Sequence, residues 1–490
     1  MKTLSKNVVL INPPAKNGLK MVGERRSITA LETQCYPPMN LLYLATMLKN
    51  KFSDLKITVK DYTVEHFSKR NLFSFLEKEK PFLVGLTCFS VNLYDAFELC
   101  KMIKDFNKEI YIFVGGPHTA IFPQETIKQP FVDLLCQGEG EKAVIQVVRN
   151  ILEARNLTNI PNVWSKKNGK IIKPPAISNS HENIDEIPFP DQSFVDLYKY
   201  FHPFLFNGRG LINIIAGRGC PFACTYCNTA LRKPRLRSCE NIIDEISLNV
   251  RKFDIRNVFF TDDTFNIKVD RIFEIAEELL KRNIKISWAF RGRVSSLNEE
   301  AFKVAKKSGL VHITLGVEDF TDEGLKMIKK NITIQQVKEA FNLCNKYNIK
   351  TTANFIIGLP HNQMPDKHNL LAKFISELSP TTIQTSILAL LPGSELYDNA
   401  VKNGILSGEI WSKYASNPQK NGFYLPGWEE GLTIADQFRI NSKINAVFYR
   451  RFSYIFKRLL EIKSFYELSI KFKVGLNLLK QSFTLNFKHP

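Results

Sequence analysis

Two long regions of this sequence alternate short apolar segments with amphipathic ones, and this alternation limits the possible folds more than any other feature. In the first region the amphipathic segments have the length of helices, and glycines follow several of the apolar segments. Apolar strands that alternate with helices are typical of a parallel sheet covered on both faces. We therefore predict a Rossmann-like, doubly wound α/β domain over residues 1–172. Its predicted strands lie at 8–14, 54–62, 82–90, 110–118 and 132–140.

The second region contains six such strand–helix units. Six units are fewer than the eight of a closed barrel, so we predict an open, partial (β/α)6 barrel over residues 205–405. A proline-rich linker is predicted at 173–204, and a mainly helical region at 406–490. Right-handed crossovers bring the carboxyl ends of all strands to one edge of a sheet, where ligands of such folds bind. The six predicted strands lie at 211–217, 257–263, 285–291, 312–319, 351–358 and 382–390.

The chain has a formal net charge of +19, and part of this excess lies near its end. From Lys443 onward, ten lysines or arginines stand against two acidic residues, Glu461 and Glu467. This tail mixes aromatic and cationic residues at helical spacing. It can therefore cover a core with one face, which is the interpretation we favour, or lie on a membrane surface and make the protein membrane-peripheral.

The sequence predicts a cytoplasmic protein with reduced thiols. Its first residues hold too short an apolar segment for a signal peptide, and no stretch is long and apolar enough to predict a membrane-spanning helix. Nine cysteines is an odd number, which argues against a disulfide framework. In a reducing compartment, clustered cysteines are metal ligands more often than disulfide partners.

Three cysteines, Cys220, Cys224 and Cys227, follow the first strand of the predicted barrel with the spacing C-x3-C-x2-C. An iron–sulfur cluster normally has four cysteine ligands, so three thiolates leave one iron open. Structural zinc sites use four protein ligands, and no second cysteine pair lies at a suitable distance in the sequence. The pattern therefore favours an iron–sulfur cluster with one open iron over zinc.

The segment GRGCPFACTYCN, from Gly217 to Asn228, resembles the signature of the radical S-adenosylmethionine (radical SAM) enzymes. This resemblance implies a [4Fe-4S] cluster on the three cysteines, S-adenosylmethionine on the open iron, and the production of a 5′-deoxyadenosyl radical. FFTDDTF and LGVEDF resemble later segments of the family, although Asp319 replaces the usual serine. The residues that the resemblance places near S-adenosylmethionine are Tyr226, Asp262, Asp263, Arg293 and Glu318.

The segments VVLINPP, VGLTCFS, FVGGPHTA and GEGE resemble the cobalamin-binding domain of one radical SAM subfamily. This resemblance implies cobalamin (B12) as a further cofactor. The chain has no Asp-x-His-x-x-Gly segment, so no histidine of that motif can be the lower ligand of cobalt. The alternative for the Gly115-Gly116 pair is a tight turn without a ligand. The candidate cobalamin contacts are Asn12, Thr87, Ser90, Gly115, Gly116, His118 and Glu139.

Together these features predict an enzyme that methylates an unactivated carbon through methylcobalamin. The alternatives are a radical cyclase or rearrangement enzyme, a tRNA methylthiotransferase with a second cluster on Cys35, Cys88 and Cys136, and a binding protein without activity. The expected partners are a small-molecule substrate, for which the basic aromatic tail suggests a hydrophobic character, and an electron donor of flavodoxin or ferredoxin type. Nucleic acid is not an expected partner, because no RNA-binding module is recognised after the barrel.

Overall fold

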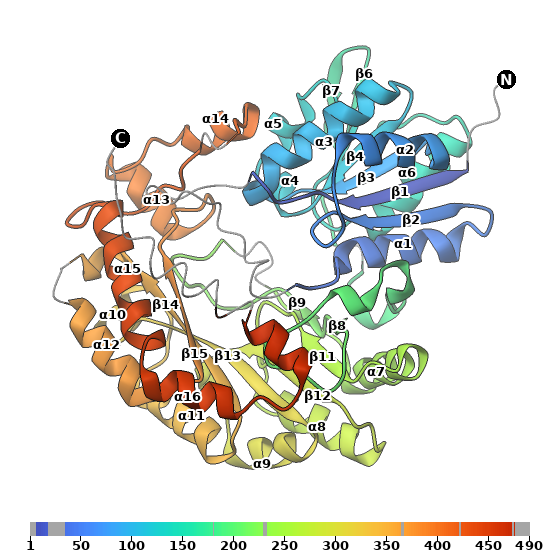
Figure 1. Cartoon of the computed structure of the whole chain (residues 1–490). Helices are drawn as coiled ribbons and strands as arrows, with labels where there is room; N and C mark the ends of the chain where they lie inside the picture. Colours follow the sequence, from blue (N-terminus) through green and yellow to red (C-terminus); the bar gives the residue numbers. More distant parts are fainter. Residues whose placement is uncertain are drawn as a thin grey trace. The chain divides into compact units, whose positions relative to one another are not determined.

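The computed structural model describes residues 6–17, 35–179, 181–228, 233–363, 367–420, 423–472 and 475. The chain forms two compact units (Figure 1). The N-terminal unit contains Met1–Leu31, Pro37–Lys199 and Gly408–Tyr424. The barrel unit contains Glu32–Tyr36, Tyr200–Ser407 and Leu425–Pro490. The chain therefore returns to the N-terminal unit once after the barrel strands, a connection that the sequence did not predict.

The N-terminal unit is built on a seven-stranded sheet. Its strands are β1 (Asn7–Asn12), β2 (Lys56–Asp61), β3 (Leu83–Thr87), β4 (Tyr111–Gly115), β5 (Leu134–Cys136), β6 (Val163–Lys167) and β7 (Lys170–Ile172). The order is β2-β1-β3-β4-β5-β6-β7, and β1 to β5 are parallel, which confirms the predicted doubly wound sheet. The antiparallel hairpin of β6 and β7 at the edge was not predicted.

The helices of this unit are α1 (Met39–Lys51), α2 (Lys69–Glu79), α3 (Leu93–Phe106), α4 (Pro117–Ile121), α5 (Pro123–Ile127), α6 (Glu141–Leu152) and α14 (Ile410–Ser416). Each longer helix buries one apolar stripe. In α6 the stripe includes Val144, Val148 and Ile151, which recur at helical spacing. Ser68 begins α2 by accepting a hydrogen bond from the N–H of Asn71. α1 packs against α6, and α2 packs against α3.

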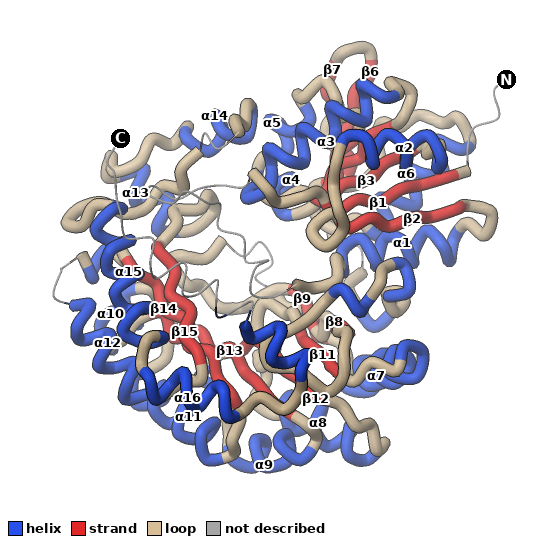
Figure 2. Tube along the Cα trace, in the orientation of Figure 1, coloured by secondary structure: helices blue, strands red, loops and turns tan. Residues whose placement is uncertain are grey.

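The barrel unit contains a six-stranded parallel sheet, drawn in red at the lower part of Figure 2. Its strands are β8 (Ile212–Ile214), β11 (Asn257–Phe260), β12 (Ser287–Gly292), β13 (Leu310–Glu318), β14 (Lys350–Ile357) and β15 (Thr382–Ile387). The order is β15-β14-β13-β12-β11-β8, and every neighbouring pair is parallel. This confirms the predicted partial (β/α)6 barrel. A separate antiparallel pair joins β9 (Gly217–Arg218) to β10 (Arg235–Leu236).

The helices of the barrel unit are α7 (Cys239–Phe253), α8 (Arg271–Lys281), α9 (Glu299–Lys307), α10 (Asp322–Met327), α11 (Ile334–Lys346), α12 (Lys367–Leu378), α13 (Glu395–Lys402), α15 (Ile434–Tyr449) and α16 (Phe452–Leu460). Helices α7, α8, α9, α11 and α12 follow the outer side of the curved sheet (Figure 1). The opposite, inner face of the sheet is not covered by these helices.

Two tail helices follow the barrel, and they differ in how they pack. In α15, the hydroxyl of Tyr449 donates to the carbonyl of Ile383 (2.6 Å) and accepts from its N–H (3.1 Å), which covers the free edge of β15. Helix α16 contains no buried residue. The interpretation that the tail covers a core with its apolar face is therefore wrong for α16. Among the described residues, no helix has the length and apolar character needed to span a membrane.

Candidate active site

The three predicted cluster cysteines lie in a loop beyond the carboxyl end of β8. Cys224 is buried, whereas Cys220 and Cys227 are partly exposed. The N–H of Cys227 donates to the carbonyl of Cys224 (3.1 Å), and the N–H of Thr225 donates to the carbonyl of Ile328 (3.1 Å). These backbone bonds form the turn that carries the last two cysteines and attach it to the segment after β13.

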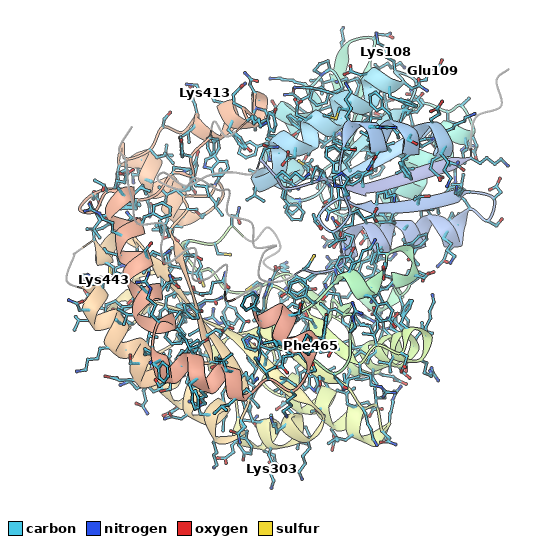
Figure 3. All side chains as sticks on the ribbon, viewed as in Figure 1. Lys108, Glu109, Lys303, Lys413, Lys443 and Phe465 are labelled. Carbon is cyan, nitrogen blue, oxygen red and sulfur yellow. The ribbon has the colours of Figure 1, made fainter. Side chains whose placement is uncertain are left out.

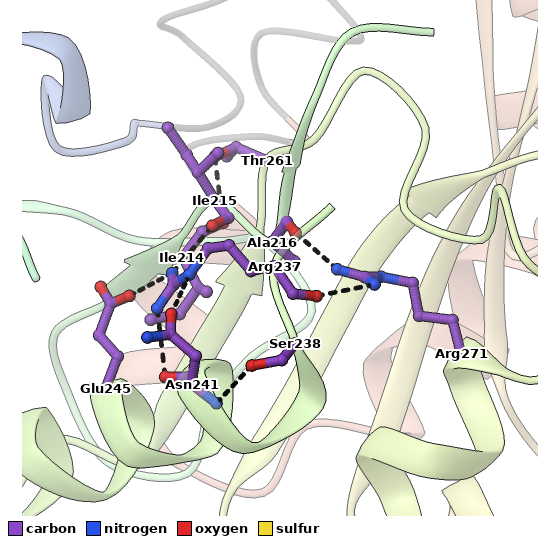
Figure 4. Close-up of polar contacts among 9 residues, drawn as sticks. All are labelled: Ile214, Ile215, Ala216, Arg237, Ser238, Asn241, Glu245, Thr261 and Arg271. Atoms are coloured by element: carbon purple, nitrogen blue, oxygen red, sulfur yellow. Dashed lines mark hydrogen bonds and ion pairs between the residues drawn. The ribbon is translucent and has the colours of Figure 1, made fainter. Parts of the chain in front are cut away.

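Two buried arginines hold the backbone where β8 leads into this loop (Figure 4). Arg237 donates to the carbonyl of Ile215 (3.0 Å) and forms a buried ion pair with Glu245. Arg271 donates to the carbonyl of Ala216 and, at 3.3 Å, to the carbonyl of Arg237. Neither arginine was predicted as part of the site, because each lies next to or within an amphipathic helix, where cations usually contact solvent.

The two aspartates after β11 also contact this loop. Asp262 accepts hydrogen bonds from the N–H groups of Ala216 and Gly217, and burial raises its pKa to about 6. Asp263 accepts a hydrogen bond from the N–H of Gly219, and burial raises its pKa as well. In this structure both aspartates thus support the backbone before Cys220. Their contact with S-adenosylmethionine, which the resemblance implied, remains a prediction.

Arg293 lies directly beside a cluster cysteine. Its Nη1 is 3.7 Å from Sγ of Cys224, and its guanidinium lies 3.7 Å from the ring centre of Phe222. The same guanidinium donates to the carbonyl of Lys330, and the backbone N–H of Arg293 donates to Asn266 Oδ1 (2.8 Å). Arg293 therefore places a buried cation beside one of the predicted cluster ligands.

Tyr226 and Glu318 are brought together by a lysine that was not predicted. Nζ of Lys330 lies 2.9 Å from Oε1 of Glu318 and 3.2 Å from the hydroxyl of Tyr226. Glu318 has a φ of 74°, a left-handed conformation that is strained for a residue with a side chain. Burial raises the pKa of Tyr226. Lys330 was missed because it follows Lys329 in a polar segment that is typical of a solvated surface.

Asp319, which stands where the family usually has serine, is buried and binds the protein itself. Its carboxylate pairs with Nε2 of His361 (3.0 Å) and accepts from the hydroxyl of Thr321 (2.8 Å). It also accepts from the side-chain amide of Asn362. In this structure Asp319 therefore fixes the turn after β13.

Four of the predicted cobalamin contacts lie together at the ends of β3 and β4 in the N-terminal unit. Thr87 Oγ1 accepts from the side-chain amide of Asn40 (2.6 Å), and Ser90 Oγ lies 2.9 Å from Nδ1 of His118. Burial lowers the pKa of His118 to about 3, so its ring is neutral. Gly116 has a φ of 108°, and a side chain there would meet the backbone after Thr87. The turn therefore requires glycine at Gly116.

The other predicted contacts lie beside this group on neighbouring strands. Asn12 donates to the carboxylate of Asp61 across β1 and β2 (2.9 Å). Glu139, after β5, accepts a hydrogen bond from Asn162 through its backbone carbonyl (2.9 Å). Gly115 ends β4. All of these residues lie at the carboxyl edge of the sheet, and their contact with cobalamin remains a prediction.

A distant segment completes this edge. The hydroxyl of Tyr414, in α14, donates to the carbonyl of Ser90 (3.0 Å), and Gln129 donates to the carbonyl of Ser416 (2.7 Å). Tyr414 stacks on Phe423 at a ring distance of 4.2 Å. This segment was not predicted as part of the edge, because it lies beyond the barrel strands in the sequence. Its cluster of aromatic residues was the signal that it packs against a core.

Comparison with known families decides the class of the protein. Residues 214–372 match the Radical SAM superfamily, and residues 26–148 match the B12 binding domain. The chain is a B12-binding radical SAM enzyme. The first match begins at the last residue of β8 and includes the cysteine loop, and the second includes α1 to β5 and ends within α6. The predicted family, enzymatic nature and fold class are thereby confirmed.

Known relatives of this B12-binding radical SAM enzyme, and solved structures similar to it, agree with the assignment. An uncharacterized methyltransferase of Pyrococcus horikoshii is 29% identical over 84% of this chain and 86% of the relative. The anaerobic magnesium-protoporphyrin IX monomethyl ester cyclase of Rubrivivax gelatinosus is 29% identical over 74% of this chain and 66% of the relative. The radical SAM methyltransferase TsrM of Kitasatospora setae, solved with cobalamin and a [4Fe-4S] cluster, has the same fold. Its TM-score is 0.69, at 17% identity over 91% of this chain and 89% of that one.

The cysteine loop fits the [4Fe-4S] cluster and S-adenosylmethionine that the family uses. It supplies three thiols, the donors that iron–sulfur clusters require, and Arg293 adds a cation beside one of them. No three side chains of cysteine, histidine, aspartate or glutamate in the described residues meet around a single ion. A cubane does not require this, because each cysteine binds a different iron.

The N-terminal edge fits cobalamin, the second cofactor of the family. Nε2 of His118 is buried and has no hydrogen-bond partner among the described residues. This atom can therefore form a hydrogen bond with a bound ligand. The ring is held by Ser90 through its other nitrogen. The glycine turn at Gly116 and the hydroxyl of Thr87 lie next to it. These groups suit the polar tail of cobalamin, and none of them is the cobalt-binding histidine of the Asp-x-His-x-x-Gly motif.

Proposed function

We propose that this enzyme transfers a methyl group from cobalamin to an unactivated carbon of a small molecule. The proposal rests on the presence of both cofactor sites in one chain: the three-cysteine loop and the polar strand-end edge of the N-terminal unit. The methyltransferase relative, which matches 84% of this chain, supports it. When bound, the cluster with S-adenosylmethionine supplies the radical, and cobalamin supplies the methyl group.

The residues of the barrel unit hold and orient these groups. Cys220, Cys224 and Cys227 are the three protein ligands of the cluster. Arg293 lies 3.7 Å from the sulfur of Cys224 and places a cation beside this ligand. Glu318 is placed to accept hydrogen bonds from S-adenosylmethionine, and Lys330 holds its carboxylate in position.

The substrate presents hydrogen-bonding groups to the inner face of the barrel sheet. Strand side chains alternate between faces, and in β14 and β15 the face away from the helices carries Asn354, Gln384 and Ser386. Asn354 pairs in register with Gln384, and its Oδ1 lacks a hydrogen-bond partner among the described residues. Because an unpaired buried amide oxygen is costly, a ligand group is the natural partner. These residues favour a polar substrate over the hydrophobic one expected from the tail.

A radical cyclase is the second candidate, because the cyclase of Rubrivivax gelatinosus aligns with 74% of this chain. The two candidates differ in what they do with S-adenosylmethionine. Methylation consumes one molecule for the radical and a second to remethylate cobalamin. Cyclisation requires only the first.

Anaerobically reconstituted, cobalamin-loaded protein separates the candidates without a known substrate. With a reductant and S-adenosylmethionine, a methyltransferase forms S-adenosylhomocysteine and methylcobalamin in addition to 5′-deoxyadenosine. The Cys224→Ala variant is the control, and it loses 5′-deoxyadenosine while it keeps S-adenosylhomocysteine formation. Formation of 5′-deoxyadenosine alone by the unmodified protein would contradict methyl transfer and favour cyclisation.

Iron content tests the tRNA methylthiotransferase alternative. Cys35 belongs to the barrel unit, whereas Cys88 and Cys136 are buried in the N-terminal unit, and burial raises the pKa of both thiols. These cysteines are therefore poor ligands for a second cluster. One cluster gives about four iron atoms per chain, and two clusters give about eight.

We further propose an external one-electron donor of flavodoxin or ferredoxin type and a cytoplasmic, membrane-peripheral location. The cluster must be reduced from outside the chain. The odd number of nine cysteines argues against a disulfide framework, which suits a reducing compartment. Stimulation of 5′-deoxyadenosine formation by reduced flavodoxin, compared with buffer alone, tests the donor.

A further inference from the structure

The tail helix α16 turns its apolar face away from the protein. Phe452, Ile455, Phe456, Leu459 and Leu460 recur at the spacing of one helix face, and each is between 40% and 82% exposed. A surface helix of a globular protein normally buries such a face. We call these five residues the α16 apolar face. An exposed apolar patch of this kind marks an interaction surface.

The opposite, polar face of α16 is the one that contacts the protein. Glu461, just after the helix, pairs with Lys350 (3.4 Å) and with Arg458 (3.0 Å). Tyr454 packs against the rings of Phe448 and Tyr449, at 5.2 and 5.6 Å, and the partial burial of its hydroxyl raises its pKa to about 12. The outward direction of the apolar face is therefore fixed by specific polar and aromatic contacts.

The helical residues that follow repeat this arrangement. Phe465, labelled in Figure 3, is 89% exposed. Its neighbour Tyr466 lies against Arg209, at 5.4 Å from the guanidinium to the ring centre. Glu467 is buried and pairs with Lys471 (2.6 Å). Here too, polar and charged groups attach the segment to the barrel unit while large apolar side chains face outward.

The charges around the α16 apolar face complement an anionic surface. Both acidic residues of the tail, Glu461 and Glu467, are already paired within the protein. Arg451, Lys457 and Lys463 are exposed beside the apolar residues. Phenylalanine and leucine on one face with lysine and arginine beside them are the features of helices that lie in the interface of an anionic membrane.

The contacts of the tail also show which end of the barrel carries this face. Lys350 is the first residue of β14, and Arg209 precedes β8, so both lie at the amino ends of the strands. The cysteine loop lies at the carboxyl end of β8. Within the barrel unit, the α16 apolar face and the cysteine loop are therefore at opposite ends of the sheet.

We propose that α16 binds the surface of an anionic lipid bilayer through its apolar face and the adjacent cations. The membrane then holds the enzyme by the amino end of the barrel, and the carboxyl end with the cysteine loop faces away from the lipid. The bilayer anchors the enzyme and does not deliver substrate directly to the cysteine loop. This inference does not depend on methyl transfer, and either can fail without the other.

Co-sedimentation of the full-length protein with vesicles tests the proposal. Vesicles of phosphatidylcholine with phosphatidylglycerol are compared with vesicles of phosphatidylcholine alone. We expect at least tenfold stronger binding to the anionic vesicles, and a loss of at least tenfold in the double variant Phe456→Ser/Leu460→Ser. Leu280→Ser, which removes an exposed leucine from α8, is the matched control and keeps binding. Lys457→Gln/Lys463→Gln weakens binding to the anionic vesicles only.

Circular dichroism and formation of 5′-deoxyadenosine verify that each variant is folded. Equal sedimentation of the parent and the Phe456→Ser/Leu460→Ser variant would overturn the proposal. A parent protein that is dimeric by light scattering and becomes monomeric in this variant, with no vesicle binding, would overturn it in favour of a second copy of the chain on the α16 apolar face.

Discussion

Lys330 and Glu318 form a buried ion pair with a separation of 2.9 Å, and their side chains are only 5% and 11% exposed. Arg293 binds the backbone carbonyl of the same lysine. One residue from a polar loop thus joins a glutamate of β13 to the arginine beside Cys224. We therefore propose Lys330 as a positioning residue for the S-adenosylmethionine site that was predicted around Tyr226 and Glu318.

We expect Lys330→Met to weaken S-adenosylmethionine binding at least tenfold and to lower the thermal midpoint. It leaves the carboxylate of Glu318 buried without its cation, which typically costs about 3–5 kcal/mol. Lys329→Met is the matched control, because Lys329 pairs with Glu395 at the surface, where such pairs contribute about 0–1 kcal/mol. Equilibrium dialysis with S-adenosylmethionine measures the affinity. If the Lys330→Met variant were destabilised but bound S-adenosylmethionine with unchanged affinity, the role of Lys330 would be purely structural.

We expect the Arg293→Lys variant to bind the iron–sulfur cluster less tightly than the parent protein. The lysine keeps the charge but loses the planar stacking on Phe222 and the forked contact with Cys224 and the carbonyl of Lys330. We expect release of iron to a chelator to be several times faster than in the parent. Arg256→Lys, at an exposed ion pair, serves as the control. Equal release rates in all three proteins would contradict a role for Arg293 at the cluster.

Asp262 predicts a pH dependence of stability. Burial raises its pKa from 3.8 to about 6, so the folded state binds this proton more tightly than the unfolded state. The stability contributed by that proton is fully present below pH 3.8 and is lost as the pH rises through about 6. The loss amounts to roughly 3 kcal/mol. Relative to Asp262→Asn, the parent should therefore lose stability between these pH values, as measured by thermal unfolding.

The matched variant for this experiment is Asp254→Asn, whose side chain is 86% exposed. The difference in stability between this variant and the parent should stay constant as the pH rises from 3.8 to about 6. A constant difference between the parent and Asp262→Asn across the pH range would mean that Asp262 does not titrate as its burial implies.

Gly116→Ala should destabilise the N-terminal unit and weaken binding of hydroxocobalamin. A Cβ there would lie 2.8 Å from the carbonyl oxygen of Cys88, in addition to the strain of a φ of 108°. Gly169→Ala separates the two effects, because Gly169 has a φ of 73° and no atom within 4 Å of an added Cβ. Strain alone costs about 1–3 kcal/mol. Absorption spectra during cobalamin titration give the affinity. If both variants lost the same amount of stability and of hydroxocobalamin affinity, a close-packed turn at Gly116 would be excluded.

The sheets were predictable because hydrophobic periodicity is local. Strands such as β1, β3, β4 and β11 are short apolar runs, and the longer covering helices repeat their apolar residues at helical spacing. The sequence of the β6–β7 hairpin also contains a local turn motif that indicates it. Asn168 and Gly169 form a two-residue turn with positive φ at both positions, which is typical of β-hairpins.

Much of the candidate site was not predictable, because burial of a charged residue depends on tertiary contacts. Arg237, Arg271 and Lys330 lie in segments whose composition is that of a solvated surface, yet all three are buried. The orientation of α16 could not be predicted from the sequence for the same reason. Its periodicity predicts an apolar face, but only the contacts of Tyr454 and Glu461 decide that this face points outward.

The return of residues 408–424 to the N-terminal unit has a consequence for how the protein is made. Tyr414 donates to Ser90 across 324 positions of the sequence, so the ribosome completes the entire barrel sheet before this contact can form. Until then, the turn at Ser90 lacks its aromatic cover. The carboxyl edge of the N-terminal sheet is therefore completed late in synthesis, and a fragment that ends at residue 172 would lack this cover permanently.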